Sequence, residues 1–226
     1  MTDTHSPILF LSGAGLPTWI WDEVRSRVGA ESAVAPRPSA HSDAPLNAYV
    51  EAAVDATPPG RFAIVAHSSG GVVGAEVARL LGERVSSFLA ISAVIPTGTD
   101  SFVSAMPAPN RWVLPTLMRL AGTRPPARAI RRGLGRGLHI DDVERIVTEF
   151  VPESRGLYMD QTGQHEWSGL RGFLLTTDDK ELPLGSQRRF VQRLGAQWTR
   201  EITTGHLPML QDPKATASAI GEFVTT

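Results

Sequence analysis

The chain has 226 residues, 42% of them hydrophobic, which suits one large α/β domain that carries an insertion. Its 22 basic and 23 acidic residues leave a net charge of −1, so no overall field favours a nucleic acid or a membrane, and we expect neither as a partner. The chain has no cysteine, which excludes disulfides, thiolate catalysis and zinc–thiolate sites.

Apolar strand patterns alternate with helical patterns over the first 96 residues. Short continuous apolar runs are typical of strands buried on both faces, and apolar residues three or four positions apart predict helices. The alternation predicts a mostly parallel, doubly wound sheet that helices cover on both faces. We expect strands at residues 7–11, 32–36, 62–65 and 86–95, and helices at 19–28, 46–56 and 71–78.

The pattern changes between residues 97 and 169, where no segment is typical of a strand. Helical spacing predicts helices near 111–121, 127–133 and 141–150. We interpret 97–169 as a helical cap inserted over the carboxyl edge of the sheet, and 1–96 with 170–226 as the core domain. In the second part of the core we expect strands at 172–176 and 197–203, and helices at 187–194 and 213–224.

The segment Ala66-His67-Ser68-Ser69-Gly70 lies between an expected strand and an expected helix. A serine between small residues at such a turn is typical of a nucleophile elbow, which exposes the Ser68 hydroxyl above the sheet. The Ser69 amide then faces the same pocket, at a helix N-terminus that favours developing negative charge. An ordinary strand-to-helix turn or a phosphate-binding loop also fits the segment, but no lysine follows the glycines as a Walker-type loop requires.

Serine catalysis needs a base and an acid that orients the base, and two later segments supply candidates. Asp178 and Asp179 follow an expected strand, and local spacing does not choose between them. An aspartate in such a loop is also a common turn former. Of the six histidines, His206 alone lies between the last expected strand and the last expected helix. The order serine, aspartate, histidine predicts a catalytic triad.

The loop Ser12-Gly13-Ala14-Gly15 follows the first expected strand and would supply a second oxyanion donor beside the Ser69 amide. Its glycines allow the backbone to approach the reacting centre closely. His67 is adjacent to the nucleophile in sequence, so we expect its side chain to point elsewhere, and to pack or to line the pocket.

Together these residues resemble the α/β-hydrolase superfamily, and in particular its branch of small capped enzymes that contains plant methyl-ester esterases and hydroxynitrile lyases. The resemblance covers nearly the whole core, and the cap only in position and rough size. It implies an α/β-hydrolase fold, and the spacing of Pro183 and Gln187 after the acid implies that Asp179 rather than Asp178 is the triad acid. It rests on residues 11–15 with Trp19-Ile20-Trp21, on 37–49, on 90–96 with Gly98, on 179–188, and on 205–210 with Pro213.

Three positions depart from parts of this branch. The branch usually has histidine where this chain has Ser12, a residue that supports the loop. The lyases carry threonine at the position of Gly13 and lysine at that of Leu207, and a cyanohydrin lyase needs a cation near the leaving cyanide. The sequence therefore argues against lyase activity and favours an esterase.

We expect a serine hydrolase that cleaves a carboxylic ester, thioester or lactone of a small-molecule substrate through an acyl-enzyme. Ser68 is the expected nucleophile, His206 the base and Asp179 the acid, while the backbone N–H groups of Ala14 and Ser69 bind the oxyanion. This chemistry requires no metal or organic cofactor. One alternative is triad-dependent acyl transfer or cyclisation, in which the substrate's own amine or hydroxyl captures the acyl group. Another is a non-catalytic protein of the same fold that binds a ligand.

The expected cap has an unusual composition. Between residues 101 and 140 there are seven arginines and no acidic residue. A solvated basic face explains such a run, and attraction of an anionic substrate or an acidic carrier protein is the alternative. The first ten residues do not resemble a signal peptide, so we expect a cytoplasmic protein, and the sequence indicates no oligomeric state. We expect the substrate pocket to include Gly13, His67, Trp112 and Leu207, with Leu114, Leu117 and Met118 adding apolar lining.

Overall fold

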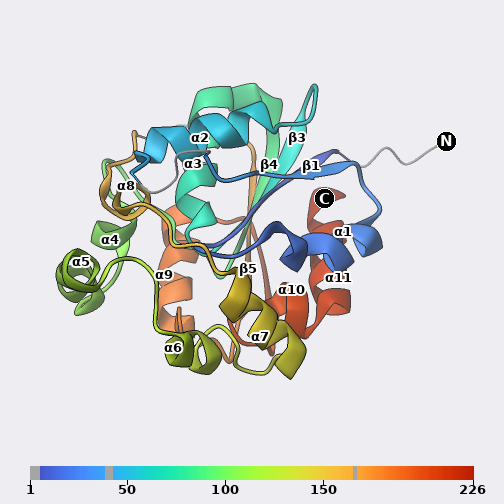
Figure 1. Ribbon diagram of the computed structural model, residues 1–226. Helices are drawn as coiled ribbons and strands as arrows, with labels where there is room; N and C mark the ends of the chain where they lie inside the picture. The colour runs from blue at the N-terminus through green and yellow to red at the C-terminus, as the bar shows by residue number, and fades with distance from the viewer. Residues whose placement is uncertain (1–5, 39–42, 165–166) are drawn as a thin grey trace.

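A computed structural model describes residues 6–38, 43–164 and 167–226 (Figure 1). Its centre is a six-stranded sheet in the order β2-β1-β3-β4-β5-β6, and every neighbouring pair is parallel. The expected α/β-hydrolase fold, with a parallel, doubly wound sheet, is thereby confirmed. The strands are β1 (Ile8–Leu11), β2 (Ser32–Val34), β3 (Phe62–His67), β4 (Val85–Ile91), β5 (Leu170–Thr176) and β6 (Trp198–Ile202).

Helices cover both faces of the sheet, because successive side chains of the central strands point to opposite faces and both sets are apolar and buried. On β1, Leu9 and Leu11 belong to one hydrophobic core, while Ile8 and Phe10 belong to the other. The first core is covered by α2 (Leu46–Asp55), α3 (Gly70–Leu81) and α9 (Leu184–Leu194). The second is covered by η1 (Thr18–Trp21), α1 (Asp22–Val28), α10 (Pro208–Gln211) and α11 (Pro213–Val224).

Five helices lie between β4 and β5, and the described residues of this segment contain no strand. The segment is the one that the sequence analysis interprets as a cap, and its boundaries stay a prediction. The five helices are α4 (Phe102–Ala105), α5 (Asn110–Ala121), α6 (Ala127–Arg132), α7 (Ile140–Glu149) and α8 (Arg155–Met159). Outside this segment, a short 3₁₀ turn, η2 (Gly82–Arg84), precedes β4.

The strand expected at 86–95 is shorter than predicted, because β4 ends at Ile91. Ser92 has a left-handed backbone with φ of 41°, which turns the chain away from the sheet. The Val94 N–H then donates to the carbonyl oxygen of Ser68 at 3.0 Å instead of extending the ladder. Ala93, Val94 and Ile95 are buried in the hydrophobic core although they lie beyond the end of the strand. Their burial explains why the apolar run in the sequence is longer than β4.

The parallel register brings the carboxyl ends of several strands to one edge. His67 of β3 is opposite Ile91 of β4, and Thr176 of β5 is opposite Ile202 of β6. Residues that directly follow these strands are thus neighbours in space although they are far apart in sequence. Among the described residues, no helix is both long and apolar enough to cross a membrane.

Candidate active site

Ser68 lies at a sharp turn between β3 and α3. Its φ of 54° is in the left-handed region, which is uncommon for a residue other than glycine. The turn brings the following backbone close to the first strand, since a Cβ atom added to Gly70 would lie 2.6 Å from the Leu11 carbonyl oxygen. A Cβ at Gly71 would similarly lie 2.5 Å from the carbonyl oxygen of Val94. The two glycines therefore permit the tight elbow that the sequence predicts.

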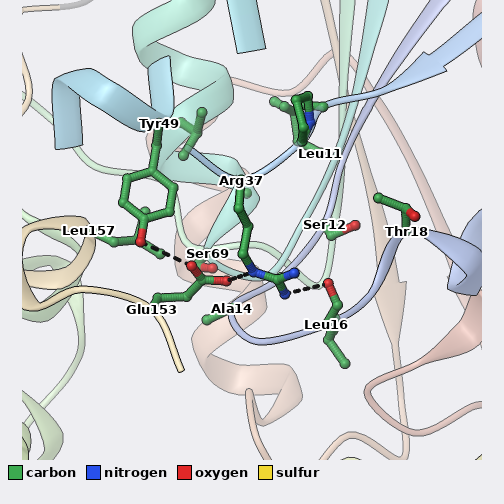
Figure 2. Close-up of a pocket in the computed structure, with 15 residues that line it drawn as sticks. Leu11, Ser12, Ala14, Leu16, Thr18, Arg37, Tyr49, Ser69, Glu153 and Leu157 are labelled. Carbon is green, nitrogen blue, oxygen red and sulfur yellow. Dashed lines mark hydrogen bonds and ion pairs between the residues drawn. The ribbon is translucent and has the colours of Figure 1, made fainter. Parts of the chain in front are cut away.

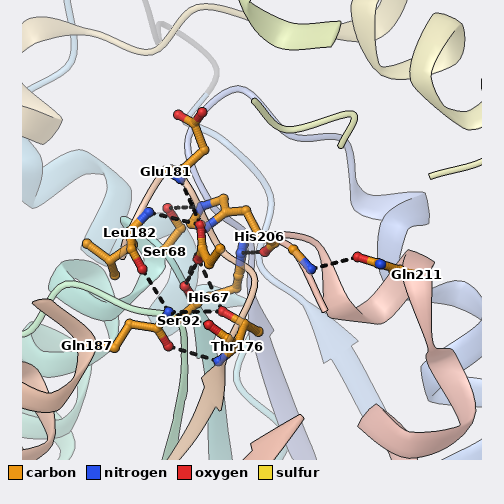
Figure 3. A network of polar contacts seen from close by, with 11 residues as sticks. His67, Ser68, Ser92, Thr176, Glu181, Leu182, Gln187, His206 and Gln211 are labelled. Carbon is orange, nitrogen blue, oxygen red and sulfur yellow. Dashed lines mark hydrogen bonds and ion pairs between the residues drawn. The ribbon is translucent and has the colours of Figure 1, made fainter. Parts of the chain in front are cut away.

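The structure brings Ser68, His206 and Asp179 into one hydrogen-bonded chain. Figure 3 shows Ser68 and His206 within the surrounding network of polar contacts. The Ser68 Oγ lies 3.0 Å from Nε2 of His206, and Nδ1 of His206 lies 2.7 Å from Oδ2 of Asp179. A carboxylate accepts hydrogen bonds only, so the His206 proton is on Nδ1 and Nε2 is free to accept the serine proton. This arrangement can perform general base catalysis on the Ser68 hydroxyl.

Asp179 is buried and held by several donors. Its Oδ1 accepts the backbone N–H groups of Glu181 at 2.8 Å and Leu182 at 2.9 Å, and Oδ2 accepts from the Thr176 hydroxyl at 3.1 Å. Burial alone would raise the pKa of Asp179, but the charge and hydrogen bond of His206, the Leu182 N–H and the Ser92 hydroxyl lower the pKa to about 2. Asp178 is exposed, and its backbone N–H donates to the carbonyl oxygen of Thr204.

Ser92 is a member of this site that the sequence analysis missed. It is fully buried, its hydroxyl donates to Oδ2 of Asp179, and its Oγ lies 3.3 Å from Nδ1 of His206. The available signal was its position: β4 lies between β3 and β5, so the residue after β4 must reach the same edge as Ser68 and Asp179. Ser92 helps to fix the carboxylate that orients the imidazole.

His67 packs beneath the site and does not line the cavity. It is fully buried, and its Nε2–H donates to the backbone carbonyl of His206 at 2.8 Å. The two imidazole rings are 4.7 Å apart between centroids. Burial and the nearby His206 lower the pKa of His67 to about 3, so its ring is neutral at ordinary pH. Of its two expected roles, the structure therefore selects packing, and His67 connects the elbow to the loop that carries His206.

Ser68 and His206 open into a cavity of about 320 Å³. Most of its lining is apolar and comes from the segment between β4 and β5. Few polar side chains line the cavity, and buried Tyr158 is one of them. Burial raises the pKa of the Tyr158 hydroxyl. The other lining residues are Ala14, Leu16, Val94, Phe102, Met106, Asn110, Leu114, Met118, Thr123, Pro125, Ala129, Ile130, Leu134, Phe150, Glu181 and Leu182.

Several expected pocket residues lie elsewhere. Trp112 is 64% exposed and Leu117 is also exposed, and neither lines the cavity, which α5 contacts through Leu114 and Met118 instead. Leu207 is buried in the core beside α10 and α11 rather than in the cavity. All seven arginines between 101 and 140 are exposed and none lines this cavity.

The loop after β1 passes directly beside Ser68. A Cβ atom on Gly13 would lie 2.8 Å from the Cβ of Ser68, so Gly13 contacts the nucleophile itself and allows the loop to approach. Ala14 lines the cavity, as Ser68 does. Among the described residues, the backbone N–H groups of Ala14 and Ser69 donate no hydrogen bond outside the helix and strand ladders. Two amide donors are thus available near the Ser68 hydroxyl.

Ser12, which stands where the related branch has histidine, still supports this loop. Its hydroxyl accepts a hydrogen bond from Nε1 of the buried Trp21 at 3.0 Å. The Leu16 N–H donates to the carbonyl oxygen of Gly13 at 3.2 Å and closes a turn around Ala14. Ser12 therefore supports the loop through the Trp21 indole.

Glu153, a second site residue missed by the sequence analysis, holds the other end of the loop (Figure 2). Its Oε1 accepts the Gly15 N–H at 2.9 Å and Nε of Arg37 at 2.6 Å, and its Oε2 accepts the Tyr49 hydroxyl at 3.0 Å. Arg37 in turn donates to the carbonyl oxygen of Leu16 at 2.7 Å. The carboxylate is buried, and a small cavity of about 60 Å³ lies beside it.

Two neighbours of Glu153 complete this support. The Val151 N–H donates to the carbonyl oxygen of Gly15 at 3.1 Å. Gly15 has a φ of 74°, and a Cβ there would overlap the ring of Phe150 at 2.0 Å. The segment that follows α7 therefore fixes the backbone on one side of Ala14, and no sequence signal links residues so far apart.

No described group of three or more His, Asp or Glu side chains is arranged to hold a metal ion. The site offers an imidazole beside the Ser68 hydroxyl and a carboxylate on the far side of that imidazole.

Comparison with solved structures finds the same fold in several proteins. An extracellular alpha/beta-hydrolase from a Paenibacillus species is 18% identical, with a TM-score of 0.81, and the alignment covers 96% of this chain and 98% of that one. A methylesterase from Arabidopsis is 14% identical, with a TM-score of 0.79 and coverage of 97% and 99%. Polyneuridine aldehyde esterase is 19% identical, with a TM-score of 0.78 and coverage of 96% and 98%. At these identities the similarity shows the fold.

A search of curated proteins finds no significant match. The sequence pattern of the alpha/beta hydrolase family, however, matches residues 8–219, nearly the whole chain. With the parallel sheet and the elbow serine described above, this match shows that the chain belongs to the alpha/beta hydrolase family.

Proposed function

We propose that the protein is a serine hydrolase that cleaves a carboxylic ester, thioester or lactone. The observation that carries the proposal is the continuous chain of hydrogen bonds from Ser68 through His206 to the buried carboxylate of Asp179. Its serine end opens into the cavity, and its carboxylate end is enclosed by protein.

In this mechanism the Ser68 Oγ attacks the substrate carbonyl carbon, and its proton passes to Nε2 of His206. The carbonyl π electrons move to the oxygen and form an oxyanion. When this intermediate collapses, the bond to the leaving group breaks, and His206 returns the proton to that group. Water then attacks the carbonyl carbon of the acyl-enzyme and gives a proton to Nε2 of His206. When this second intermediate collapses, the bond between the acyl carbon and the Ser68 Oγ breaks, His206 returns the proton to that oxygen, and the acid is released. Asp179 holds the imidazole in the required tautomer and stabilises its charged form.

The amides of Ala14 and Ser69 would bind the oxyanion. Losing one such donor typically costs about 100- to 1000-fold in rate. Donors contribute most when they are already in place before the reaction, and the contacts of Gly13, Gly15 and Leu16 hold this loop from several sides. The Ser69 amide is held at the start of α3.

The apolar lining of the cavity favours an uncharged, largely hydrophobic substrate. The proteins of similar structure include an esterase, a methylesterase and a pyrethroid hydrolase, which agrees with ester cleavage. The same apolar lining supports intramolecular capture of the acyl group as a second candidate, because few water molecules would compete. Mass spectrometry of the product distinguishes these two reactions. An acyl product that has gained one water indicates hydrolysis, and an acyl product released without added water indicates cyclisation.

The decisive experiment replaces Ser68 by alanine and measures turnover of a short aryl ester, together with fluorophosphonate labelling. We expect the variant to lose at least about a thousandfold in kcat and to lose labelling. Unchanged turnover would refute the assignment of Ser68. A wild-type protein that binds ligands but resists labelling would instead support the non-catalytic alternative.

A further inference from the structure

The outer face of α5 is apolar although no part of the described protein covers it. No residue of this helix is buried, and four large apolar side chains are 53–78% exposed. With 3.6 residues per turn they fall within an arc of about 140°. Leu114 and Met118, which line the cavity, lie on the other side of the helix. The four exposed residues, called the outer face below, are Trp112, Val113, Leu117 and Leu120.

Two arginines, Arg111 and Arg119, belong to the same helix as the outer face, and both are exposed. The segment 101–140 as a whole holds seven exposed arginines and no acidic residue, although Arg131 is paired with Glu144 of α7. The Arg111 guanidinium lies 4.7 Å from the centroid of the Trp112 ring. The expectation that no membrane is a partner rests on the net charge of −1 for the whole chain, and this net charge does not represent the local excess of arginine. An exposed apolar face beside two exposed arginines is complementary to an anionic, apolar surface.

The dimensions of the outer face argue against a protein partner. A 12-residue helix is about 18 Å long and 10–12 Å wide, so one face offers about 200 Å². A stable protein interface needs about 800 Å² from each partner. A two-fold contact between copies through this face would also bring like arginine clusters together, which is unfavourable. In Figure 1, α5 is at the edge of the molecule, where a flat surface can reach it.

We propose that α5 is an interfacial helix that docks the protein onto anionic lipid. Trp112 and Leu120 enter the boundary between headgroups and acyl chains, and the arginines bind lipid phosphates. Both interactions are those of amphipathic helices that lie in a membrane surface. The inner face of the same helix lines the cavity, so docking places the cavity beside the lipid. This docking does not depend on the proposed catalytic activity.

Co-sedimentation of the full chain with vesicles tests the proposal. We expect binding to vesicles of equal parts phosphatidylglycerol and phosphatidylcholine, little binding to phosphatidylcholine alone, and weaker binding at high salt. The double substitution Trp112→Ser with Leu120→Ser should reduce partitioning by at least about tenfold. Arg111→Gln with Arg119→Gln should also weaken binding to the anionic vesicles.

Matched controls exist elsewhere on the surface. Leu80 of α3 is 50% exposed, and Leu80→Ser should leave vesicle binding unchanged. Arg27→Gln with Arg200→Gln changes the net charge equally and should have a smaller effect than the α5 pair, because both lie outside the basic segment. Since all of these side chains are partly exposed, thermal unfolding should show intact folds. The Ser68→Ala variant should bind as the wild type does.

Three results would overturn the proposal. The first is failure of the wild-type protein to bind anionic vesicles. The second is equal binding by the Trp112→Ser, Leu120→Ser variant and the Leu80→Ser control. The third is a wild-type dimer in analytical ultracentrifugation, or a complex with an acidic carrier protein, that this α5 variant abolishes while vesicle binding persists. In that case the outer face serves a protein partner.

Discussion

Replacement of Glu153 by glutamine tests whether the segment after α7 controls the reaction through the loop beside Ser68. The carboxylate accepts hydrogen bonds from Gly15, Arg37 and Tyr49, and its side chain is 4% exposed. Glutamine keeps the size and one acceptor oxygen, but it loses the negative charge opposite Arg37. Hydrogen bonds to charged groups contribute about 1.5–3 kcal/mol each, so we expect the free energy of unfolding to fall by about that amount.

The effect on catalysis follows from the position of Ala14, one residue before Gly15. Complete loss of an oxyanion donor costs about 100- to 1000-fold, and Glu153→Gln loosens the donor without removing it. We therefore expect kcat to fall about tenfold, equivalent to about 1.4 kcal/mol of transition-state stabilisation. KM should stay within about twofold, because the cavity that binds the substrate is lined by other residues.

Steady-state kinetics with an aryl ester, combined with thermal unfolding, measure both effects. Glu144→Gln is the matched control, because Glu144 pairs with Arg131 on the surface and has no contact with the loop. Tyr49→Phe removes one donor to Glu153 but keeps the charge, and it should give a smaller loss of kcat than Glu153→Gln. If Glu153→Gln lowers the melting temperature while kcat equals that of the control, Glu153 stabilises the fold only and the reasoning fails.

Three further predictions concern the acid, the buried histidine and the elbow. Asp179→Asn should lower kcat by about 10⁴-fold, because an amide favours the wrong imidazole tautomer, and a loss below tenfold would contradict its role. The pKa of Asp179 falls from 3.8 to about 2 on folding, so its carboxylate stabilises the folded state by about 2 kcal/mol above pH 4. This contribution to the free energy of unfolding disappears as the pH falls toward 2. Urea unfolding of the Asp179→Asn variant should therefore show a smaller loss of stability between pH 4 and pH 2 than the wild type. The pKa of His67 falls from 6.5 to about 3 on folding, so between these values only the unfolded state binds a proton at this residue. The free energy of unfolding therefore decreases by about 1.4 kcal/mol for each unit by which the pH falls in this range. His67→Gln should flatten this slope in urea unfolding between pH 4 and 6.5, and an unchanged slope would show that other groups cause it. Gly70→Ala should destabilise the fold by about 1–3 kcal/mol, because its Cβ would lie 2.6 Å from the Leu11 carbonyl oxygen, whereas Gly221→Ala meets no atom within 4 Å and should not destabilise. Equal melting temperatures for the two alanine variants would contradict the tight elbow.

Local sequence patterns were sufficient for the sheet and for the elements that carry the site. The strands and longer helices have apolar periods that are visible within ten or so residues, and Ser68 and His206 each occupy a turn next to such an element. Helices α4, α8 and α10 have only four or five residues, too few for a helical period to appear, and the sequence analysis did not predict them. The spacing after Asp179 distinguished it from Asp178 through the family resemblance, and the structure places Asp179 against His206.

Other features depended on contacts between distant segments. Ser92 meets Asp179 across 87 residues, and Glu153 meets Gly15 across 138, so no local pattern could pair them. Because α5 is apolar on two sides, its periodicity could not show that Leu114 would face the cavity and Trp112 would face solvent. Periodicity identifies an apolar helix face, but only packing against the rest of the chain determines which face is buried. The sequence by itself therefore determined the sheet and the positions of the reactive groups, whereas the tertiary structure decided what holds those groups in place and which side chains meet the substrate.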